Sequence, residues 1–215
     1  MKKAIVLLSG GLDSATTLYL AKSRGFDCSC LIFDYGQRHR KEIASAKRIA
    51  EFAHCHYRLI KLNFLHKGSA LLDRNREIPK HGSGIPHTYV PARNIVFLSF
   101  ALSYAETIGA KAIFIGANAI DYSGYPDCRP QFYQAFRKVV ACGTKAGVEK
   151  KAIRIETPLI QKTKAGIIRL GLKLGVPFGL TWSCYRGGEH PCGRCDSCYF
   201  RAKGFREAGR RDPLK

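Results

Sequence analysis

Near its start the chain has a continuous apolar run, residues 4–8, that ends abruptly in Ser9-Gly10-Gly11. Five consecutive apolar residues are typical of a parallel strand that is covered on both of its faces. The two glycines allow a tight turn with positive φ, and the residues after them predict a helix that ends near Gly25. A strand, a glycine turn and a helix in this order predict the first unit of an α/β fold, with an anion site at the helix N-terminus.

The same alternation continues along the rest of the chain. Further strands are predicted over residues 28–33, 57–62, 112–116 and 152–156, and helices over residues 42–53, 93–108, 132–141 and 164–174. Strands that alternate with helices form a mainly parallel sheet, so we expect a doubly wound α/β fold. Ligands of such sheets bind beyond the carboxyl ends of the strands, where Ser9, Asp34 and Gly116 should meet. Residues 63–91 have no clean period and predict a long functional loop.

Length and charge limit the classes of function. The chain has 215 residues, of which 46% are hydrophobic, and this is enough for one sizeable α/β core with a small appendage. A formal net charge of +20 favours anionic partners such as nucleotides, phosphates or RNA. The first apolar run is too short for a signal peptide or a membrane span, so we expect a cytoplasmic protein with no membrane partner.

The nine cysteines argue for a metal or for catalytic thiols, because disulfides are rare in the cytoplasm. Four of them follow the spacing C-x7-C-x2-C-x2-C, namely Cys184, Cys192, Cys195 and Cys198. Four thiolates suit one closed, tetrahedral and structural zinc ion per chain. An iron–sulfur cluster is the alternative, although the Cys-Pro that closes bacterial ferredoxin runs is missing. We therefore expect an α/β domain over residues 1–180 and a zinc-binding region over residues 181–215.

The glycine turn lacks the signatures of two common phosphate-binding loops, because no Gly-Lys-Ser/Thr follows and Gly-x-Gly-x-x-Gly is absent. The string SGGLDS, residues 9–14, instead resembles the pyrophosphate loop of the N-type ATP pyrophosphatases. That resemblance implies binding of ATP with Mg²⁺ and release of pyrophosphate. The implied ATP-binding residues are Leu8, Ser9, Gly10, Gly11, Leu12, Asp13, Ser14, Ala15, Thr16, Thr17 and Leu18. We expect a side chain at Gly10 to abolish ATP binding and to leave the fold intact.

Two further strings carry candidate binding residues. Arg93, directly before a predicted helix, could clamp a phosphate or a carboxylate. Residues 121–129 hold two Tyr, two Asp and one Arg, which could stack on and hydrogen-bond a flat, guanine-like ring. Together with FDYGQRH, residues 33–39, and TWSCY, residues 181–185, these strings resemble the 7-cyano-7-deazaguanine synthase family over nearly the whole chain. Ala92 stands where that family usually has Gly.

The resemblance implies an ATP-dependent carbon–nitrogen ligase of queuosine precursor synthesis. Such an enzyme adenylates 7-carboxy-7-deazaguanine, lets ammonia displace AMP, and activates the resulting amide again to form the nitrile preQ0. Ser9 would hold pyrophosphate, Asp13 would support Mg²⁺, and Arg93 and Lys164 would counter the charge that develops on the leaving group. The implied substrate pocket is Asp121, Tyr122, Tyr125, Asp127 and Arg129. The family suggests a homodimer, and the reaction needs no nucleic acid.

Two other functions remain open at this point. One is a tRNA-modifying enzyme of the same superfamily, a thiolase or a lysidine-type enzyme. The basic charge favours it, and Cys128 is the candidate for the reactive cysteine of a thiolase. The other is a non-catalytic zinc module that binds RNA. Its basic face would be Arg201, Lys203, Arg206, Arg210 and Arg211.

Overall fold

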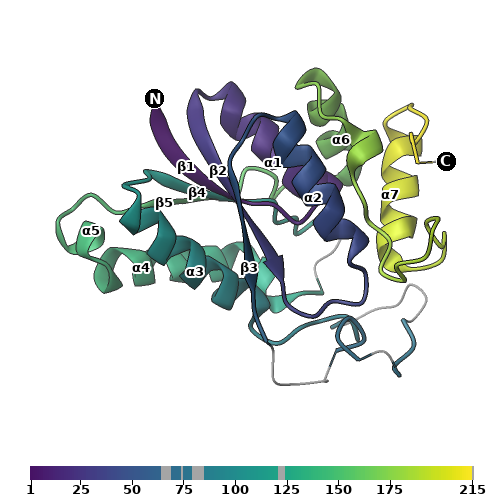
Figure 1. Ribbon diagram of the computed structural model, residues 1–215, viewed down its shortest axis with the longest axis horizontal. Coiled ribbons are helices and arrows are strands. Elements are labelled where there is room, and N and C mark those ends of the chain that lie inside the picture. Colours follow the sequence, from purple (N-terminus) through teal and green to yellow (C-terminus); the bar gives the residue numbers. More distant parts are fainter. Residues whose placement is uncertain (64–68, 74, 79–84, 121–123, 215) are drawn as a thin grey trace.

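The computed structural model describes residues 1–63, 69–73, 75–78, 85–120 and 124–214. Its strands form one parallel sheet in the order β3-β2-β1-β4-β5 (Figure 1). The strands are β1 (Lys2–Leu7), β2 (Phe26–Asp34), β3 (Tyr57–Lys61), β4 (Ala112–Ile115) and β5 (Arg154–Glu156). The helices are α1 (Leu12–Ser23), α2 (Lys41–Phe52), α3 (Arg93–Thr107), α4 (Pro130–Gly143), α5 (Lys145–Val148), α6 (Lys164–Lys173) and α7 (Asp196–Glu207). The predicted doubly wound fold is confirmed.

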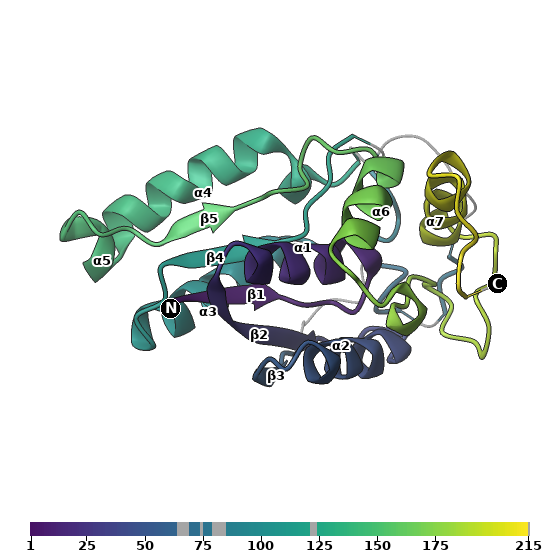
Figure 2. The same ribbon diagram turned by 90° about the horizontal axis from the view of Figure 1, so that it is seen from above.

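Helices cover both faces of the sheet (Figure 2), and the packing of the β1 side chains explains this arrangement. Ala4 and Val6 pack in a cluster with α1, α2, α6 and Phe205 of α7, whereas Ile5 and Leu7 pack with α3 and α4. Successive side chains of a strand point to opposite faces, so a run without polar residues needs apolar cover on each side. Among the described residues, no helix is long and apolar enough to cross a bilayer.

The order of the strands opens a crevice beside β1. The chain adds β2 and β3 on one side of β1 and then β4 and β5 on the other, which makes a topological switch point between β1 and β4. The glycine turn follows β1, and Gly116 follows β4. A Cβ on Gly116 would lie 2.9 Å from the carbonyl carbon of Asp13 and from the backbone nitrogen of Ser14. The end of β4 therefore packs directly against the start of α1.

The C-terminal tail contains α7, which the sequence does not predict. This helix packs along α6, and a Cβ on Gly204 would lie only 2.5 Å from Cγ of Lys164. Before the helix, the backbone N–H of Trp182 donates to the carbonyl of Gly10 at 2.9 Å. Tertiary contacts thus hold the tail on the α/β core. The division of the chain at residue 180 stays a prediction.

Gly10 packs against a helix rather than only facing a ligand. Its φ is +84°, and a Cβ there would lie 2.2 Å from the carbonyl oxygen of Glu42 and 2.8 Å from the backbone nitrogen of Ala46. Both atoms belong to the backbone of α2, which cannot move aside as a flexible side chain can. The expectation that a side chain at Gly10 leaves the fold intact is therefore wrong.

We expect Gly10→Ala to lower the free energy of unfolding by about 3 kcal/mol, because the overlap with α2 adds to the cost of a left-handed residue that carries a Cβ. Gly25→Ala is the matched control. Gly25 has a φ of +78° with nothing within 4 Å of its Cβ position, so about 1–2 kcal/mol should be lost. Urea titrations measure both values. Equal losses would show that α2 does not constrain the turn.

Candidate functional site

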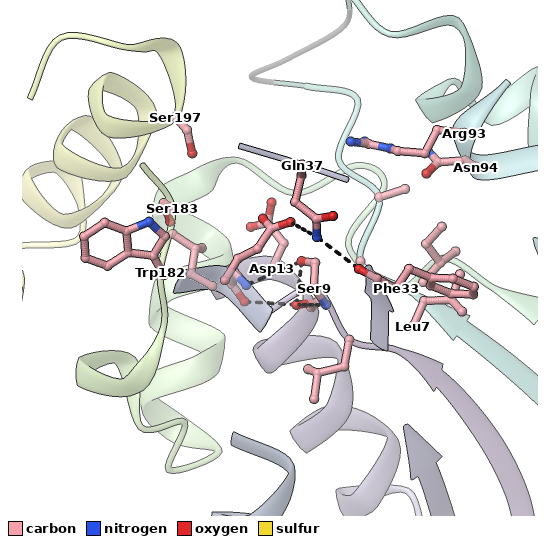
Figure 3. Close-up of a pocket in the computed structure, with 18 of the residues that line it drawn as sticks. Leu7, Ser9, Asp13, Phe33, Gln37, Arg93, Asn94, Trp182, Ser183 and Ser197 are labelled. Atoms are coloured by element: carbon pink, nitrogen blue, oxygen red, sulfur yellow. Dashed lines mark hydrogen bonds between the residues drawn. The ribbon is translucent and has the colours of Figure 1, made fainter. Parts of the chain in front are cut away.

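A pocket of about 290 Å³ lies beyond the carboxyl ends of β1, β2 and β4 (Figure 3). Its walls include the glycine turn, the exits of β2 and β4, the starts of α3 and α6, and the C-terminal tail. In Figure 3, Arg93 and Asn94 lie on the side opposite Trp182, Ser183 and Ser197, and Ser9, Asp13 and Gln37 lie between them. The crevice expected from the strand order is thus a real cavity.

Two serines hold the glycine turn in shape. Ser14 Oγ accepts from the backbone nitrogen of Ser9 at 3.2 Å and donates to the carbonyl of Gly11 at 3.1 Å. Ser9 Oγ lies 3.1 Å from Ser14 Oγ. Gly11 is the N-cap of α1 and has no side chain with which to cap the helix. The first N–H groups of the helix and the positive end of its dipole therefore suit an anion such as a phosphate.

The predicted ATP-binding segment divides between the pocket and the core. The part that lines the pocket is Leu8, Ser9, Gly11, Leu12, Asp13 and Ser14. The other members, Gly10, Ala15, Thr16, Thr17 and Leu18, do not line it; Thr16 and Thr17 donate to the carbonyls of Leu12 and Asp13. The ATP-binding role of the segment stays a prediction, and the pocket favours its first half.

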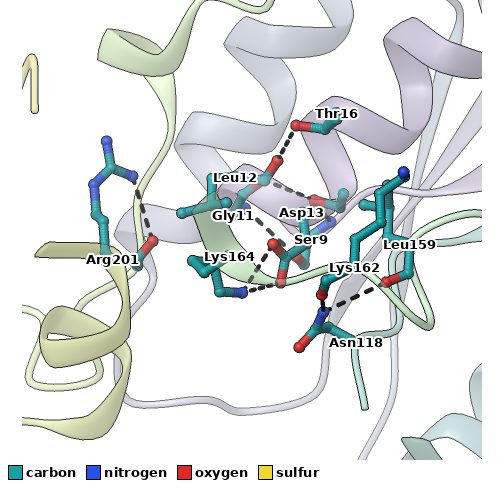
Figure 4. Close-up of polar contacts among 12 residues, drawn as sticks. Ser9, Gly11, Leu12, Asp13, Thr16, Asn118, Leu159, Lys162, Lys164 and Arg201 are labelled. Carbon is teal, nitrogen blue, oxygen red and sulfur yellow. Dashed lines mark hydrogen bonds and ion pairs between the residues drawn. The ribbon is translucent and has the colours of Figure 1, made fainter. Parts of the chain in front are cut away.

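Lys164 and Asp13 form an ion pair at the glycine turn (Figure 4). Lys164 Nζ lies 2.9 Å from Oδ1 and 2.7 Å from Oδ2 of Asp13. Lys164 is the first residue of α6 and follows a loop that Asn118 holds, because Asn118 Nδ2 donates to the carbonyls of Leu159 and Lys162. An ammonium group, which can bind phosphate oxygens, thus lies beside a carboxylate, which can bind a divalent cation.

Arg93 lies in an aromatic part of the pocket. Its Nη1 donates to the hydroxyl of Tyr35 at 3.2 Å, and its guanidinium carbon lies 5.7 Å from the centre of that ring. Burial raises the pKa of the Tyr35 hydroxyl, so the phenol stays neutral and can accept. Next to it, Phe33 and Phe97 stack with ring centres 4.0 Å apart. This part of the pocket, Phe33, Tyr35, Arg93, Phe97 and Tyr125, is called the aromatic lobe below.

Of the predicted substrate residues, Tyr125 lines the pocket and Asp127 does not. The hydroxyl of Tyr125 lies 2.7 Å from Oγ1 of Thr88. Asp127 is buried, and its Oδ2 accepts from the backbone nitrogen of Asn94 at 3.0 Å, at the start of α3. The carboxylate therefore fixes the helix that carries Arg93. A direct substrate contact of Asp127 stays a prediction.

The other predicted substrate residues give less information. Asp121 and Tyr122 lie outside the described residues. Arg129 is exposed at the N-cap of α4 and is not part of the pocket lining. Cys128 does line the pocket, and burial, the largest cause, raises the pKa of its thiol to about 12. Asp34, at the end of β2, is not part of the lining, whereas Ser9 and Gly116 meet there as expected.

Several pocket residues received no role from the sequence. Gln37 Nε2 donates to the carbonyl of Phe33 and to Oε1 of Glu42, both at 3.0 Å. His39 is 2% exposed, and its Nε2 lies 2.9 Å from Oε2 of Glu42. The only early signal for them was the unusually polar string FDYGQRH directly after a buried strand. The string predicted a site, but not which side chain enters the pocket.

Arg201 is buried rather than part of a basic face. It is 3% exposed, its Nε and Nη2 lie 2.8 and 2.9 Å from the carboxylate oxygens of Asp212, and its Nη1 donates to Oγ1 of Thr181 at 2.7 Å. The proposal that Arg201 contributes to an RNA-binding face is therefore wrong. Its role is to hold the tail beside the pocket.

The four predicted metal ligands come together in one cluster. The Sγ atoms of Cys184, Cys192, Cys195 and Cys198 all lie within 4.8 Å of one another. Zinc–sulfur bonds of about 2.3 Å in a tetrahedron place sulfurs about 3.8 Å apart, so the cluster fits a metal ion. Backbone N–H groups donate to the sulfurs of Cys184 and Cys192. Such hydrogen bonds favour the thiolates that bind metals.

Comparison with known proteins identifies the family. The model of the family "Queuosine biosynthesis protein QueC" matches residues 3–209. The chain belongs to the QueC family. It is 54% identical over 217 residues to 7-cyano-7-deazaguanine synthase 2 of Desulfitobacterium hafniense (strain Y51), covering 100% of this chain and 93% of the relative. The synthase of Thermoplasma volcanium is 51% identical over 219 residues, with 100% and 90% covered.

Solved structures agree on the fold. NMN synthetase from Francisella tularensis aligns with a TM-score of 0.53 at 16% identity, over 98% of this chain and 78% of that one. A 4-thiouridine synthetase–RNA complex with bound ATP aligns with a TM-score of 0.50 at 19% identity, over 97% and 50%. At these identities the likeness concerns the fold alone. It confirms the architecture expected for a QueC protein.

The cysteine cluster generates a prediction with an optical readout. Trp182 is the single tryptophan of the sequence, packs with Cys184 and Cys195, and donates from Nε1 to the carbonyl of Cys184 at 3.0 Å. Removing the bound metal ion with a chelator should therefore shift the Trp182 emission to longer wavelength, because metal binding and local folding are coupled. Cys195→Ser should do the same. The control Cys142→Ser, at an exposed thiol, should keep metal and spectrum. An unchanged spectrum after metal loss would contradict the coupling.

Proposed function

We propose that this chain is an ATP-dependent ligase that converts 7-carboxy-7-deazaguanine and ammonia to 7-cyano-7-deazaguanine. The observation that carries the proposal is its membership of the QueC family, with relatives named 7-cyano-7-deazaguanine synthase that are more than half identical across the whole chain. The pocket supports it independently. It combines an anion-binding turn at a helix N-terminus with an aromatic lobe that suits a flat heterocycle.

The glycine turn is proposed to bind the pyrophosphate part of ATP. The backbone N–H groups of residues 10 and 11 and the hydroxyls of Ser9 and Ser14 donate to its oxygens. Asp13 supports Mg²⁺, directly or through water, and Lys164 moves from Asp13 to the phosphates. This arrangement places positive charge where pyrophosphate develops negative charge as it leaves.

The reaction proposed for the pocket has two activation rounds. A carboxylate oxygen of the substrate attacks the α-phosphorus of ATP, and pyrophosphate leaves. Ammonia forms the carbon–nitrogen bond, and AMP leaves with the release of one proton. The amide oxygen then attacks the α-phosphorus of a second ATP, and pyrophosphate leaves again. Loss of AMP, which takes the amide oxygen with it, and of both N–H protons gives the nitrile. No protein nucleophile is needed, so catalysis rests on positioning and electrostatics.

The aromatic lobe is proposed to hold the deazaguanine ring. Tyr125 and the stacked pair Phe33–Phe97 offer apolar contact to a planar ligand. Asp127 supports this lobe through its bond to the start of α3. Contacts between the substrate and Asp121, Tyr122 and Arg129 are proposed from the family resemblance alone.

We propose that the cysteine cluster holds zinc with a structural role. Four thiolates leave no open coordination position for chemistry on a substrate. The cluster joins the tail segment at Cys184 to α7, which carries Cys198. An iron–sulfur cluster is the alternative occupant of the same ligands.

Elemental analysis of protein purified under anaerobic conditions distinguishes the two metals. We expect about one zinc per chain and a colourless protein, as four thiolates at this spacing predict. Iron with matching sulfide and visible absorbance would overturn the zinc assignment. Replacing Cys55, which lies outside the cluster, by Ser should leave the metal content unchanged.

The two RNA-directed alternatives receive less support from the site. A thiolase needs a reactive thiolate, whereas burial raises the pKa of Cys128 to about 12, so the thiol is protonated at neutral pH. Arg201 does not contribute to a basic RNA-binding face, because it is buried against Asp212. The net charge of +20 still permits an RNA contact elsewhere. A homodimer and ammonia as the nitrogen donor are proposed from the family resemblance, and a cytoplasmic location is proposed from the short first apolar run.

The function is tested with purified protein, 7-carboxy-7-deazaguanine, ammonium, ATP and Mg²⁺, without RNA. We expect the nitrile and an amide intermediate, with AMP and pyrophosphate as co-products. Lys164→Met should lower kcat about 100-fold or more, since it removes a charge that stabilises the leaving group. Lys173→Met, at the exposed end of the same helix, is the matched control and should keep full activity. ATP consumption that requires tRNA, without nitrile, would reject the proposal.

A further inference from the structure

Arg93 carries a positive charge, and no carboxylate among the described residues forms an ion pair with it. Its hydrogen bond goes to the neutral hydroxyl of Tyr35, and its guanidinium lies near the ring of that residue. The carboxylate of Asp127 lies near Arg93 in the fold, but its Oδ2 accepts a hydrogen bond from the backbone nitrogen of Asn94. A guanidinium on the wall of a largely aromatic lobe is costly without a counter-ion, so the lobe suits an anionic ligand.

The pocket already has a separate place for the phosphates. Lys164, Asp13 and the uncapped start of α1 gather at the glycine turn. Arg93 projects instead from the start of α3, on the side of Phe33 (Figure 3). The two cationic groups therefore belong to different parts of one cavity, which fits two anions that must react with each other.

We propose that Arg93 binds the carboxylate of the acid substrate, rather than the leaving pyrophosphate, and so makes the aromatic lobe specific for the acid. This inference rests on the proposed function. In the first round a carboxylate oxygen forms the bond to the α-phosphorus, the bond to the bridging oxygen breaks, and the electron pair leaves with pyrophosphate. Arg93 holds the other carboxylate oxygen and offsets the repulsion between the carboxylate and ATP.

The two rounds of the reaction separate this role from a role at the phosphates. The first round uses an anionic acid and the second a neutral amide, while ATP and its leaving group are the same in both. A residue that binds the carboxylate affects the first round selectively. A residue that stabilises pyrophosphate affects both rounds equally. The effect of an Arg93 substitution on the first round, divided by its effect on the second round, therefore identifies the ligand of Arg93.

The experiment measures steady-state kinetics from each starting compound. With the acid, ATP and ammonium, Arg93→Met should raise the KM for the acid about 10- to 100-fold, the usual cost of a lost hydrogen bond to a charged group. With the amide and ATP, no ammonium is needed, and the KM for the amide should change less than about threefold, because the amide carries no charge to lose. The KM for ATP should stay unchanged. Arg93→Lys should recover part of the affinity for the acid, since it keeps the charge but loses the planar fork.

Arg58→Met is the matched control. Arg58 also lies over a tyrosine ring, that of Tyr104 at 4.9 Å, but outside this pocket. All its kinetic constants should equal those of the unaltered enzyme. Equal rises in KM for acid and amide in Arg93→Met, or a rise for ATP, would overturn the proposal.

A binding measurement on the unaltered enzyme covers the case that Arg93→Met does not fold. Calorimetry without nucleotide should show the acid binding at least about tenfold more tightly than the amide. Equal affinities would overturn the role of Arg93. If the unaltered enzyme binds the acid in this way but forms no nitrile, the proposed function fails and the carboxylate site stands.

Discussion

The arrangement of the site depends on the close packing of one turn, residues 9–11, between backbone segments. Gly10 lies against the carbonyl of Glu42 in α2, and its own carbonyl accepts from the backbone nitrogen of Trp182. Gly116 at the end of β4 packs against the start of α1 directly after the turn. None of these contacts leaves room for a side chain, so the turn has little freedom to change shape. Its rigidity keeps the N–H groups at the start of α1 pointing at one place, which is what a site for phosphate requires.

The C-terminal tail belongs to this arrangement rather than to a separate module. Two cysteines of the cluster belong to this helix, Cys195 as its N-cap and Cys198 in its first turn. The pocket-lining residues of the same helix are Ser197, Phe200 and Arg201. Gly204 lets α7 pack on the stem of Lys164. Arg201 is buried, but its guanidinium donates to a carboxylate, to two hydroxyls and to a carbonyl, and such partners allow a buried charge to be tolerated. A metal ion in the cluster would therefore hold α7 and the pocket residues that it carries in place.

The sequence predicted the strands and most helices because hydrophobic periodicity reports burial directly. Ile43, Ala46, Ile49 and Ala50 recur at helical spacing in the sequence, and all four are buried on α2. Hydrophobic periodicity does not show which other element of the fold covers a residue. The sequence therefore did not predict α7, a helix that is held in place by the cysteine cluster and by its packing on α6. The sequence also does not show whether a polar residue in a motif binds a ligand or stabilises the fold. Asp127 stands in a string rich in candidate ligands, yet it caps α3 because the start of a helix also attracts carboxylates.

Ala92 shapes the backbone at the start of α3, where Arg93 stands. It has a φ of +56° and is the N-cap of α3, so the position where the family usually has Gly is indeed left-handed, at a cost of about 1–2 kcal/mol for a residue with a Cβ. Strain of this kind persists where the surrounding contacts fix the backbone, and here Asp127 and Tyr89 hold the amides of Asn94 and Ala92. The bend directs Arg93 into the aromatic lobe.

In the proposed reaction one lobe must accept first an acid and then its amide, which differ in charge but hardly in shape. Flat aromatic walls serve both compounds, and a single arginine held by a neutral phenol serves the anionic one. The same pocket can therefore carry out both rounds without rebuilding its walls between them.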